Sequence, residues 1–292
     1  MSSIQCQNVV KRFGKTTALA GVTATLESGK IYGLIGRNGA GKTTLMKAIA
    51  GQIIPQEGSI TLDGEPILEN QPMLDEICLS RGFSSQTLMA MKVKDILKSG
   101  ALYYKYWDAD FAKRLLEEFE LPEKKQYLKL SSGMQSALNI ILGFASRAPF
   151  TLFDEPVAGL DVVVRERFYQ ILLDDYAEHP RTFVLSTHLI EEASTIFEDI
   201  IFIDKGRVLL SEETDALRNR YRIVDGPADE VERFLAGHEV LHKEALAGKL
   251  TACVKLDGKV PPEGIEVREA PMQKLFVYLT EKNKGVGSHD AK

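Results

Sequence analysis

Residues 36–43 read Gly36-Arg37-Asn38-Gly39-Ala40-Gly41-Lys42-Thr43, and this stretch decides the fold. It follows an apolar run, Ile31 to Ile35, that is typical of a buried strand, and it precedes a helical pattern from Thr43 to Ala50. Glycines let backbone N–H groups turn inward around phosphate oxygens, because a residue without a Cβ adopts the required φ values without strain. The phosphates then meet a helix N-terminus, which favours anions. This order of elements predicts a P-loop that binds a nucleoside triphosphate.

Two side chains of the loop have separate expected tasks. Lys42 is placed to reach the β- and γ-phosphates as a point charge, and the hydroxyl of Thr43 is placed to hold Mg²⁺. The expected nucleotide ligands are Gly36, Arg37, Asn38, Gly39, Ala40, Gly41, Lys42, Thr43 and Thr44.

Composition sets the class of the protein. With 292 residues and 44% hydrophobic content, the chain can form one large or two modest globular domains. A net charge of -5 argues against a general nucleic-acid binder, so we expect no nucleic-acid partner and only a local basic surface. Cys6, Cys78 and Cys253 are far apart and fit a reducing cytosol better than a disulfide framework or a zinc site. No apolar run reaches the ~20 residues needed to cross a bilayer.

Periodicity divides the chain into parts. Residues 1 to about 35 are β-rich, and helical spacing dominates from Val93 to Ala145. Beyond Phe150, strand patterns alternate with helix patterns, which favours a parallel sheet with ligands at the carboxyl ends of its strands. The expected segments are a strand at 150–153, a helix at 165–176, a strand at 182–186, a helix at 189–197 and a strand at 200–203.

The predicted fold class is therefore α/β, a P-loop NTPase core with a β-rich N-terminal part and a helical insertion. We expect a core domain over 1–210, with its helical subdomain at about 88–148. A small α/β module is expected at 211–281, followed by a disordered polar tail at 282–292.

Two acids follow the strand at 150–153. Asp154 is expected on the Mg²⁺ side, because that ion prefers hard oxygen ligands. Glu155 is expected to face the attacking water and to orient it or accept its proton.

With these residues in view, the sequence resembles the nucleotide-binding subunits of ATP-binding cassette (ABC) transporters over residues 4 to 210. The further motifs that carry the resemblance are a signature loop at Leu130-Ser131-Ser132-Gly133-Met134-Gln135, a Q-loop at Phe83-Ser84-Ser85-Gln86, a D-loop at Ala158-Gly159-Leu160-Asp161, a switch histidine in Ser186-Thr187-His188, and an aromatic residue in Lys11-Arg12-Phe13-Gly14.

The resemblance implies a role for each matched residue. Phe13 would stack on adenine, Gln86 would contact Mg²⁺ or the attacking water, and His188 would bind the γ-phosphate and help to position the water. Ser131 and Gly133 would cover the γ-phosphate held by a second subunit. Two chains would thus clamp two ATP molecules, with Asp161 linking the two active sites.

Several residues depart from the family pattern. Ser132 replaces the usual first glycine of the signature, while Val157 and Val162 replace the more common Thr or Ser and proline. None of these changes removes a catalytic group, so we expect hydrolysis to be retained. A homodimer and an asymmetric heterodimer both remain open.

An aromatic cluster, Tyr103-Tyr104-Lys105-Tyr106-Trp107-Asp108, allows two interpretations. Such clusters usually pack in a core; the alternative is a groove edge that accepts a helix of a membrane subunit. The Trp-Asp element most resembles the subfamily paired with ABC-2-type permeases, including bacitracin-export-like and acetoin-operon-like subunits.

We therefore expect a cytoplasmic ATPase that needs ATP and Mg²⁺, pairs with a second ABC subunit, and is attached to the inner face of the cell membrane through an integral permease. The alternative is a soluble, non-transport ABC ATPase with a regulatory role. Transport is favoured because the regulatory ABC ATPases usually carry two cassettes or large insertions. This sequence has one cassette and no such insertion.

Overall fold

A computed structural model describes residues 2–83, 85–256 and 262–286 of the chain. The chain divides into two compact units. The first consists of residues 1–188 and 203–208, and the second of residues 189–202 and 209–292. The expected boundary at residue 210 therefore differs from the observed division, in which residues 189–202 cluster with the C-terminal part.

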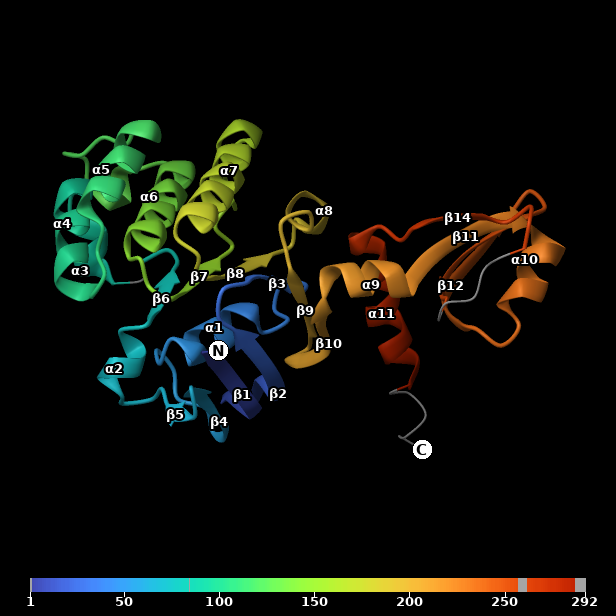
Figure 1. Ribbon diagram of the computed structural model, residues 1–292. Helices are drawn as coiled ribbons and strands as arrows, with labels where there is room; N and C mark the ends of the chain where they lie inside the picture. The colour runs from blue at the N-terminus through green and yellow to red at the C-terminus, as the bar shows by residue number, and fades with distance from the viewer. Residues whose placement is uncertain (1, 84, 257–261, 287–292) are drawn as a thin grey trace. The chain divides into compact units, whose positions relative to one another are not determined.

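The first unit begins with an antiparallel sheet of order β2-β1-β4-β5 (Figure 1). Its strands are β1 (Ser3–Phe13), β2 (Thr16–Glu27), β4 (Glu57–Leu62) and β5 (Glu65–Pro66). Along β2 the side chains of Leu19, Val22, Ala24 and Leu26 are buried, and the last three alternate with exposed residues, as in a sheet with one covered face. The β-rich N-terminal part is thus present.

The parallel strands form the centre of the nucleotide core. The second sheet has the order β10-β9-β3-β8-β7-β6, and β3 with β8, β8 with β7, and β7 with β6 pair in parallel. The strands are β3 (Ile31–Ile35), β6 (Ile77–Ser80), β7 (Phe150–Asp154), β8 (Thr182–Thr187), β9 (Asp199–Asp204) and β10 (Arg207–Glu213). All residues of β3 and β8 are buried, which explains why their sequences are almost continuously apolar or small.

Between β6 and β7 the chain is helical. Figure 1 shows α3, α4 and α5 gathered beyond β6. The helices of this unit are α1 (Lys42–Ile49), α2 (Gln71–Leu74), α3 (Gln86–Ala90), α4 (Val93–Tyr103), α5 (Ala109–Glu118), η1 (Tyr127–Lys129), α6 (Ser132–Ala145) and α7 (Val162–Glu178).

An aromatic core joins α6 and α7 to the parallel sheet. The ring centroid of Phe144 in α6 lies 5.1 Å from that of Phe153, 5.8 Å from that of Phe168 and 6.0 Å from that of Phe183. A Cβ added to Gly143 would lie 2.4 Å from the Phe153 ring, so glycine is needed for this close helix-to-strand approach. Burying each ring contributes about 1.5–3 kcal/mol.

A buried ionic cluster lies behind this core. Asp175 in α7, only 4% exposed, forms ion pairs with Arg147 and with Arg181, whose Nη2 lies 2.7 Å from Asp175 Oδ2. Arg147 also pairs with Asp108, the N-cap of α5, at 2.9 Å. The cluster therefore ties the start of α5 to the end of α6 and to α7.

The second unit contains an antiparallel sheet of order β12-β13-β11-β14. Its elements are α8 (Ile190–Ala193), α9 (Thr214–Arg220), β11 (Tyr221–Pro227), α10 (Ala228–Leu235), β12 (Glu239–Leu246), β13 (Lys249–Lys255), β14 (Glu266–Glu269) and α11 (Met272–Val286). Val231 and Leu235 of α10 pack with Val224 and Leu250 in one hydrophobic cluster. This part of the chain forms an α/β module.

Two sequence-based expectations in this unit were wrong. The helix expected at 189–197 ends at Ala193, and the Ser194 hydroxyl donates to the carbonyl of Glu191, a local bond that competes with helix continuation. The tail expected to be disordered from residue 282 is helical as far as Val286. Residues 287–292 lie outside the described residues.

Within the described ranges, no helix combines the length and the apolar character needed to traverse a bilayer.

The three cysteines are free and buried, and burial raises the pKa of the Cys6 thiol to about 12.

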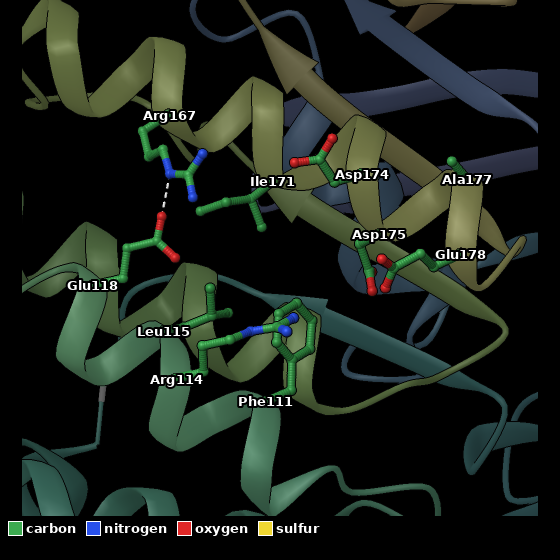
Figure 2. A pocket seen from close by; sticks show the side chains of 10 residues that line it. All are labelled: Phe111, Arg114, Leu115, Glu118, Arg167, Ile171, Asp174, Asp175, Ala177 and Glu178. Atoms are coloured by element: carbon green, nitrogen blue, oxygen red, sulfur yellow. Dashed lines mark hydrogen bonds and ion pairs between the residues drawn. The ribbon is translucent and has the colours of Figure 1, made fainter.

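The buried ionic cluster gives a test of stability. Asp175→Ala should lower the free energy of unfolding by about 3–5 kcal/mol, because it leaves the buried guanidinium of Arg181 without its carboxylate and removes one of the two carboxylates that pair with Arg147. Asp174→Ala is the matched control, since Asp174 is the exposed neighbour on the same helix (Figure 2), and should change stability by less than about 0.5 kcal/mol. Urea denaturation measures both values. Equal losses in the two variants would contradict a special contribution from the buried ion pairs.

Candidate nucleotide-binding and catalytic site

Two glycines of the P-loop, Gly36 and Gly41, lie where a side chain would collide with neighbouring backbone. Gly41, the N-cap of α1, has a φ of 111°, and a Cβ there would lie 2.7 Å from the carbonyl oxygen of Ala18. A Cβ on Gly36 would lie 2.5 Å from the carbonyl oxygen of Ile203. Side chains are therefore excluded at both ends of the loop, and the loop passes directly from β3 to the N-terminus of α1.

Lys42 is buried at the start of α1 and is held by groups of the site itself. Its Nζ donates to the carbonyl oxygen of Gly36 at 2.7 Å and lies 3.1 Å from Oε1 of Glu155. The Lys42 side chain is 6% exposed. The ammonium group is thus fixed between the loop and the end of β7.

The start of α1 and the ends of β7 and β8 are joined by hydrogen bonds to one carboxylate, that of Asp154. Thr43 Oγ1 donates to Asp154 Oδ1 at 3.0 Å, and Ser186 Oγ donates to the same oxygen at 2.9 Å. Asp154 and Ser186 are opposite each other in the register of β7 with β8. The geometry brings together Thr43 and Asp154, the two residues expected to hold Mg²⁺.

Glu155 adopts a backbone conformation that is rare for a residue with a side chain. Its φ is 51°, and its N–H donates to Ser186 Oγ at 2.9 Å. Its carboxylate reaches Lys42 with one oxygen, and its other oxygen, Oε2, lies 2.8 Å from Nδ1 of His188. Left-handed backbone outside glycine has a conformational cost, and such residues concentrate at functional sites.

Phe13 and Gln86 lie apart from this cluster. The Phe13 ring, at the end of β1, is 52% exposed and lies 5.3 Å from Nζ of Lys11. An exposed ring face is suited to stacking on a base. Gln86 begins α3 and is exposed; within the described residues it makes no hydrogen bond to Asp154 or Glu155.

The signature loop and the D-loop form a second locus. Ser131 caps α6 by accepting from the N–H of Met134 at 3.3 Å, and Asp161 caps α7 by accepting from the N–H of Val164 at 3.0 Å. A Cβ added to Gly133 would lie 3.4 Å from the Gly159 carbonyl oxygen. Both loops line one cavity of about 570 Å³, and none of the P-loop residues lines it.

Ser186 is a functional residue that motif matching missed. The sequence pattern attaches importance to His188, whereas Ser186 both donates to Asp154 and accepts from the backbone of Glu155. The available signal was a small hydroxyl residue at the end of the strand expected to run beside β7. Its partner depends on the register between the two strands, which a local pattern does not supply.

Comparisons with known proteins agree with this geometry. A family model described as ABC transporter matches residues 19–158. Over 224 residues the chain is 30% identical to the uncharacterized ABC transporter ATP-binding protein YybJ of Bacillus subtilis (strain 168). The aligned region covers 72% of this chain and 96% of YybJ. The chain belongs to the family of ABC transporter ATP-binding proteins. As a member of this family it is an ATP-binding and ATP-hydrolysing subunit of a transporter.

Another relative of this ABC protein is the ABC transporter ATP-binding protein YtrB of Bacillus subtilis (strain 168). It is 29% identical over 218 residues, covering 75% of this chain and 74% of YtrB. A solved dimeric structure of an ATP-binding cassette in a post-hydrolysis state, bound to ADP and Pi, superposes with a TM-score of 0.62 at 24% identity, covering 72% of this chain and 98% of that chain. That likeness shows a shared cassette fold and confirms the predicted fold class.

Ser186 gives a test of the catalytic geometry. Ser186→Ala should lower kcat at least about tenfold. Without the Ser186 hydroxyl the Glu155 N–H loses its acceptor, which lowers the free energy of unfolding by about 1–3 kcal/mol. The left-handed backbone of Glu155 is then no longer held, and its carboxylate moves from its position. Steady-state ATPase assays and urea denaturation measure the two effects. Ser146→Ala is the control, since Ser146 is also buried and both donates and accepts through its hydroxyl. It should lose stability while keeping kcat, and an equal loss of kcat would count against a positioning role for Ser186.

Proposed function

We propose that this chain hydrolyses ATP with the groups at the ends of β3, β7 and β8 while paired with a second ABC subunit, and that the cycle drives a separate integral permease. One observation carries the proposal. The Glu155 carboxylate lies within 3.1 Å of Lys42 Nζ and 2.8 Å of His188 Nδ1, at the carboxyl edge of the parallel sheet. A carboxylate between a phosphate-binding lysine and an imidazole is suited to positioning the attacking water.

Each group has a defined task in the proposed reaction. Lys42 exchanges its contact with Glu155 for the phosphate oxygens and offsets the negative charge that develops on the γ-phosphate. Glu155 then orients the water or accepts its proton, and His188 holds Glu155 and contacts the γ-phosphate. Phosphoryl transfer of this kind depends mainly on positioning and electrostatics, and these residues supply both.

The residues around Asp154 fit a magnesium ion. Thr43 Oγ1 and Asp154 Oδ1 lie 3.0 Å apart and are hard oxygen donors from two elements, with the Gln86 amide as a third candidate. When bound, Mg²⁺ would supply Lewis-acid stabilisation of the negative charge on the phosphates. Asp154 and Thr43 would hold the ion, and Ser186 would keep the Asp154 carboxylate in its orientation.

A second ABC subunit is needed to complete each site in this proposal. The signature loop and D-loop line a cavity separate from the P-loop, so Ser131 and Gly133 act on the nucleotide of a partner. Val162 and Val163, 59% and 77% exposed, follow Asp161 and leave apolar surface for an interface. ATP held between two chains favours the closed pair, and hydrolysis releases it. A homodimer and a heterodimer fit equally.

The permease partner and the location follow from family membership and remain proposals. The relatives are described as transporter ATP-binding proteins, one of them a lantibiotic transport protein, SrtF of Streptococcus pyogenes, 27% identical over 228 residues. We propose that this chain is attached to the inner face of the cell membrane. Its Trp-Asp element favours the subfamily of ATPases that pair with ABC-2-type permeases. In that element the Trp107 ring packs over Gly100 of α4 and stacks on Tyr104, while Tyr103 is 77% exposed and available to form a groove edge.

Glu155→Gln tests the catalytic proposal. The variant should keep ATP affinity, lose kcat by about a hundredfold or more, and accumulate as a closed dimer with ATP, because the amide no longer accepts a proton. Radiolabelled ATP binding, phosphate release and size-exclusion chromatography with ATP measure the three properties. A variant that stays monomeric and hydrolyses ATP at the normal rate would overturn the assignment.

Lys42→Ala tests the binding site separately. ATP affinity should fall at least about tenfold, because a charge-assisted contact to phosphate contributes about 1.5–3 kcal/mol. Isothermal titration calorimetry with ATP gives the affinity. Lys47→Ala, at the other end of the same helix, is the control and should bind ATP normally. Unchanged affinity in Lys42→Ala would place the phosphates elsewhere.

A further inference from the structure

A concentration of lysines lies on the helical insertion of a chain whose net charge is -5. The backbone of residues 122–126 runs beside the start of α4, since the N–H of Val93 donates to the carbonyl of Lys125 and the N–H of Lys94 donates to that of Glu123, both at 3.0 Å. Residues 91–107 and 122–130 together hold seven lysines and two carboxylates, Asp95 and Glu123. We call the following residues the lysine surface: Lys92, Lys94, Lys98, Lys105, Lys124, Lys125 and Lys129.

Most of these cations are not neutralised by the protein. Lys105 is the exception, because its Nζ forms an ion pair with Oε1 of Glu76 at 2.9 Å. The other six lysines are exposed and form no ion pair with any residue in the described ranges. Unpaired charge of one sign on one face attracts a partner of the opposite sign.

Exposed apolar side chains lie among these cations. Lys94, Lys98 and Leu102 are four residues apart and so share one face of α4, whereas Val93 and Ile96 face the interior. Leu102 is 83% exposed. Leu128, 57% exposed, adds further apolar area next to Lys129. Unpaired lysines with an exposed leucine among them offer a membrane surface both a cation for its phosphates and an apolar side chain for the boundary below the headgroups.

We propose that the lysine surface, with Leu102 and Leu128, binds directly to the anionic surface of a lipid bilayer. The lysines meet the lipid phosphates, and the apolar side chains enter the boundary between headgroups and acyl chains. A nucleic acid or an acidic protein segment would satisfy the charges, but phosphates or carboxylates alone give no reason for Leu102 and Leu128 to be exposed. The contact goes beyond ATP hydrolysis and does not depend on the catalytic assignment. It would orient the helical insertion toward the membrane independently of a permease.

The test uses the purified full-length chain and vesicles. Flotation with equimolar phosphatidylcholine and phosphatidylglycerol should recover the protein with the vesicles, and flotation with phosphatidylcholine alone should not. Raising the salt concentration from about 0.1 M to about 0.5 M should release it, because the screening length shortens. Absence of binding to the anionic vesicles at the lower salt concentration would overturn the proposal.

Matched variants localise the contact. Lys94→Gln with Lys98→Gln should reduce vesicle partitioning at least about tenfold, since each lysine near an anionic surface contributes about fivefold. Lys249→Gln with Lys274→Gln changes the net charge equally at exposed sites of the second unit and should partition normally. Equal reductions in both double variants would overturn the assignment to this surface. All four substitutions lie outside the catalytic site, so ATPase activity without lipid reports intact folding.

A charge-neutral variant separates a bilayer from other polyanions. Leu102→Ser should weaken partitioning at least about fivefold, because it removes an apolar side chain that would be buried among the lipids. Binding to heparin, a soluble polyanion, should be unaffected by this substitution. If Leu102→Ser partitions normally and heparin competes fully with the vesicles, the surface serves a nucleic-acid or acidic protein partner and the bilayer proposal fails.

Discussion

Two hydroxyl groups donate to one oxygen of Asp154, and the site depends on this pair of hydrogen bonds. Thr43 comes from the start of α1 and Ser186 from the end of β8, so the carboxylate joins three segments that are far apart in the sequence. The same Ser186 oxygen accepts the Glu155 N–H and thereby supports a left-handed backbone. Without these bonds Glu155 would relax to a more common conformation, and its carboxylate would leave the space between Lys42 and His188.

The second constraint is the separation of two anion-binding helix ends. The N-terminus of α1 belongs to the P-loop, while that of α6 is capped by Ser131 beside the D-loop. The cavity that the signature loop and the D-loop line together includes no residue of the P-loop. In the proposed pair of chains each triphosphate would be held by both ends, and the free energy of ATP binding would then be coupled to dimer formation.

The rigid core and the charged surface of the first unit have different consequences. The aromatic cluster around Phe144 and the buried pairs of Asp175 fix α6 and α7 against the sheet, so that the capped loops are presented at a constant position. The outer face of α4 makes no such contacts and has unpaired lysines beside Leu102. Stability thus comes from the inner face of the insertion, and its outer face is free for a partner.

The sequence by itself determined the P-loop pattern, the paired acids after β7 and the α/β class, because glycine conformations, apolar runs and residue order are local properties. The role of His188 was implied only by the family resemblance. Only the tertiary structure decided that Ser186 binds Asp154, that α8 stops at Ala193, that Asp175 pairs with two arginines, and that lysines from two segments share one surface. These features depend on strand register and on contacts between distant segments. A periodic pattern contains no information about such contacts, since the same residues satisfy it with many different neighbours.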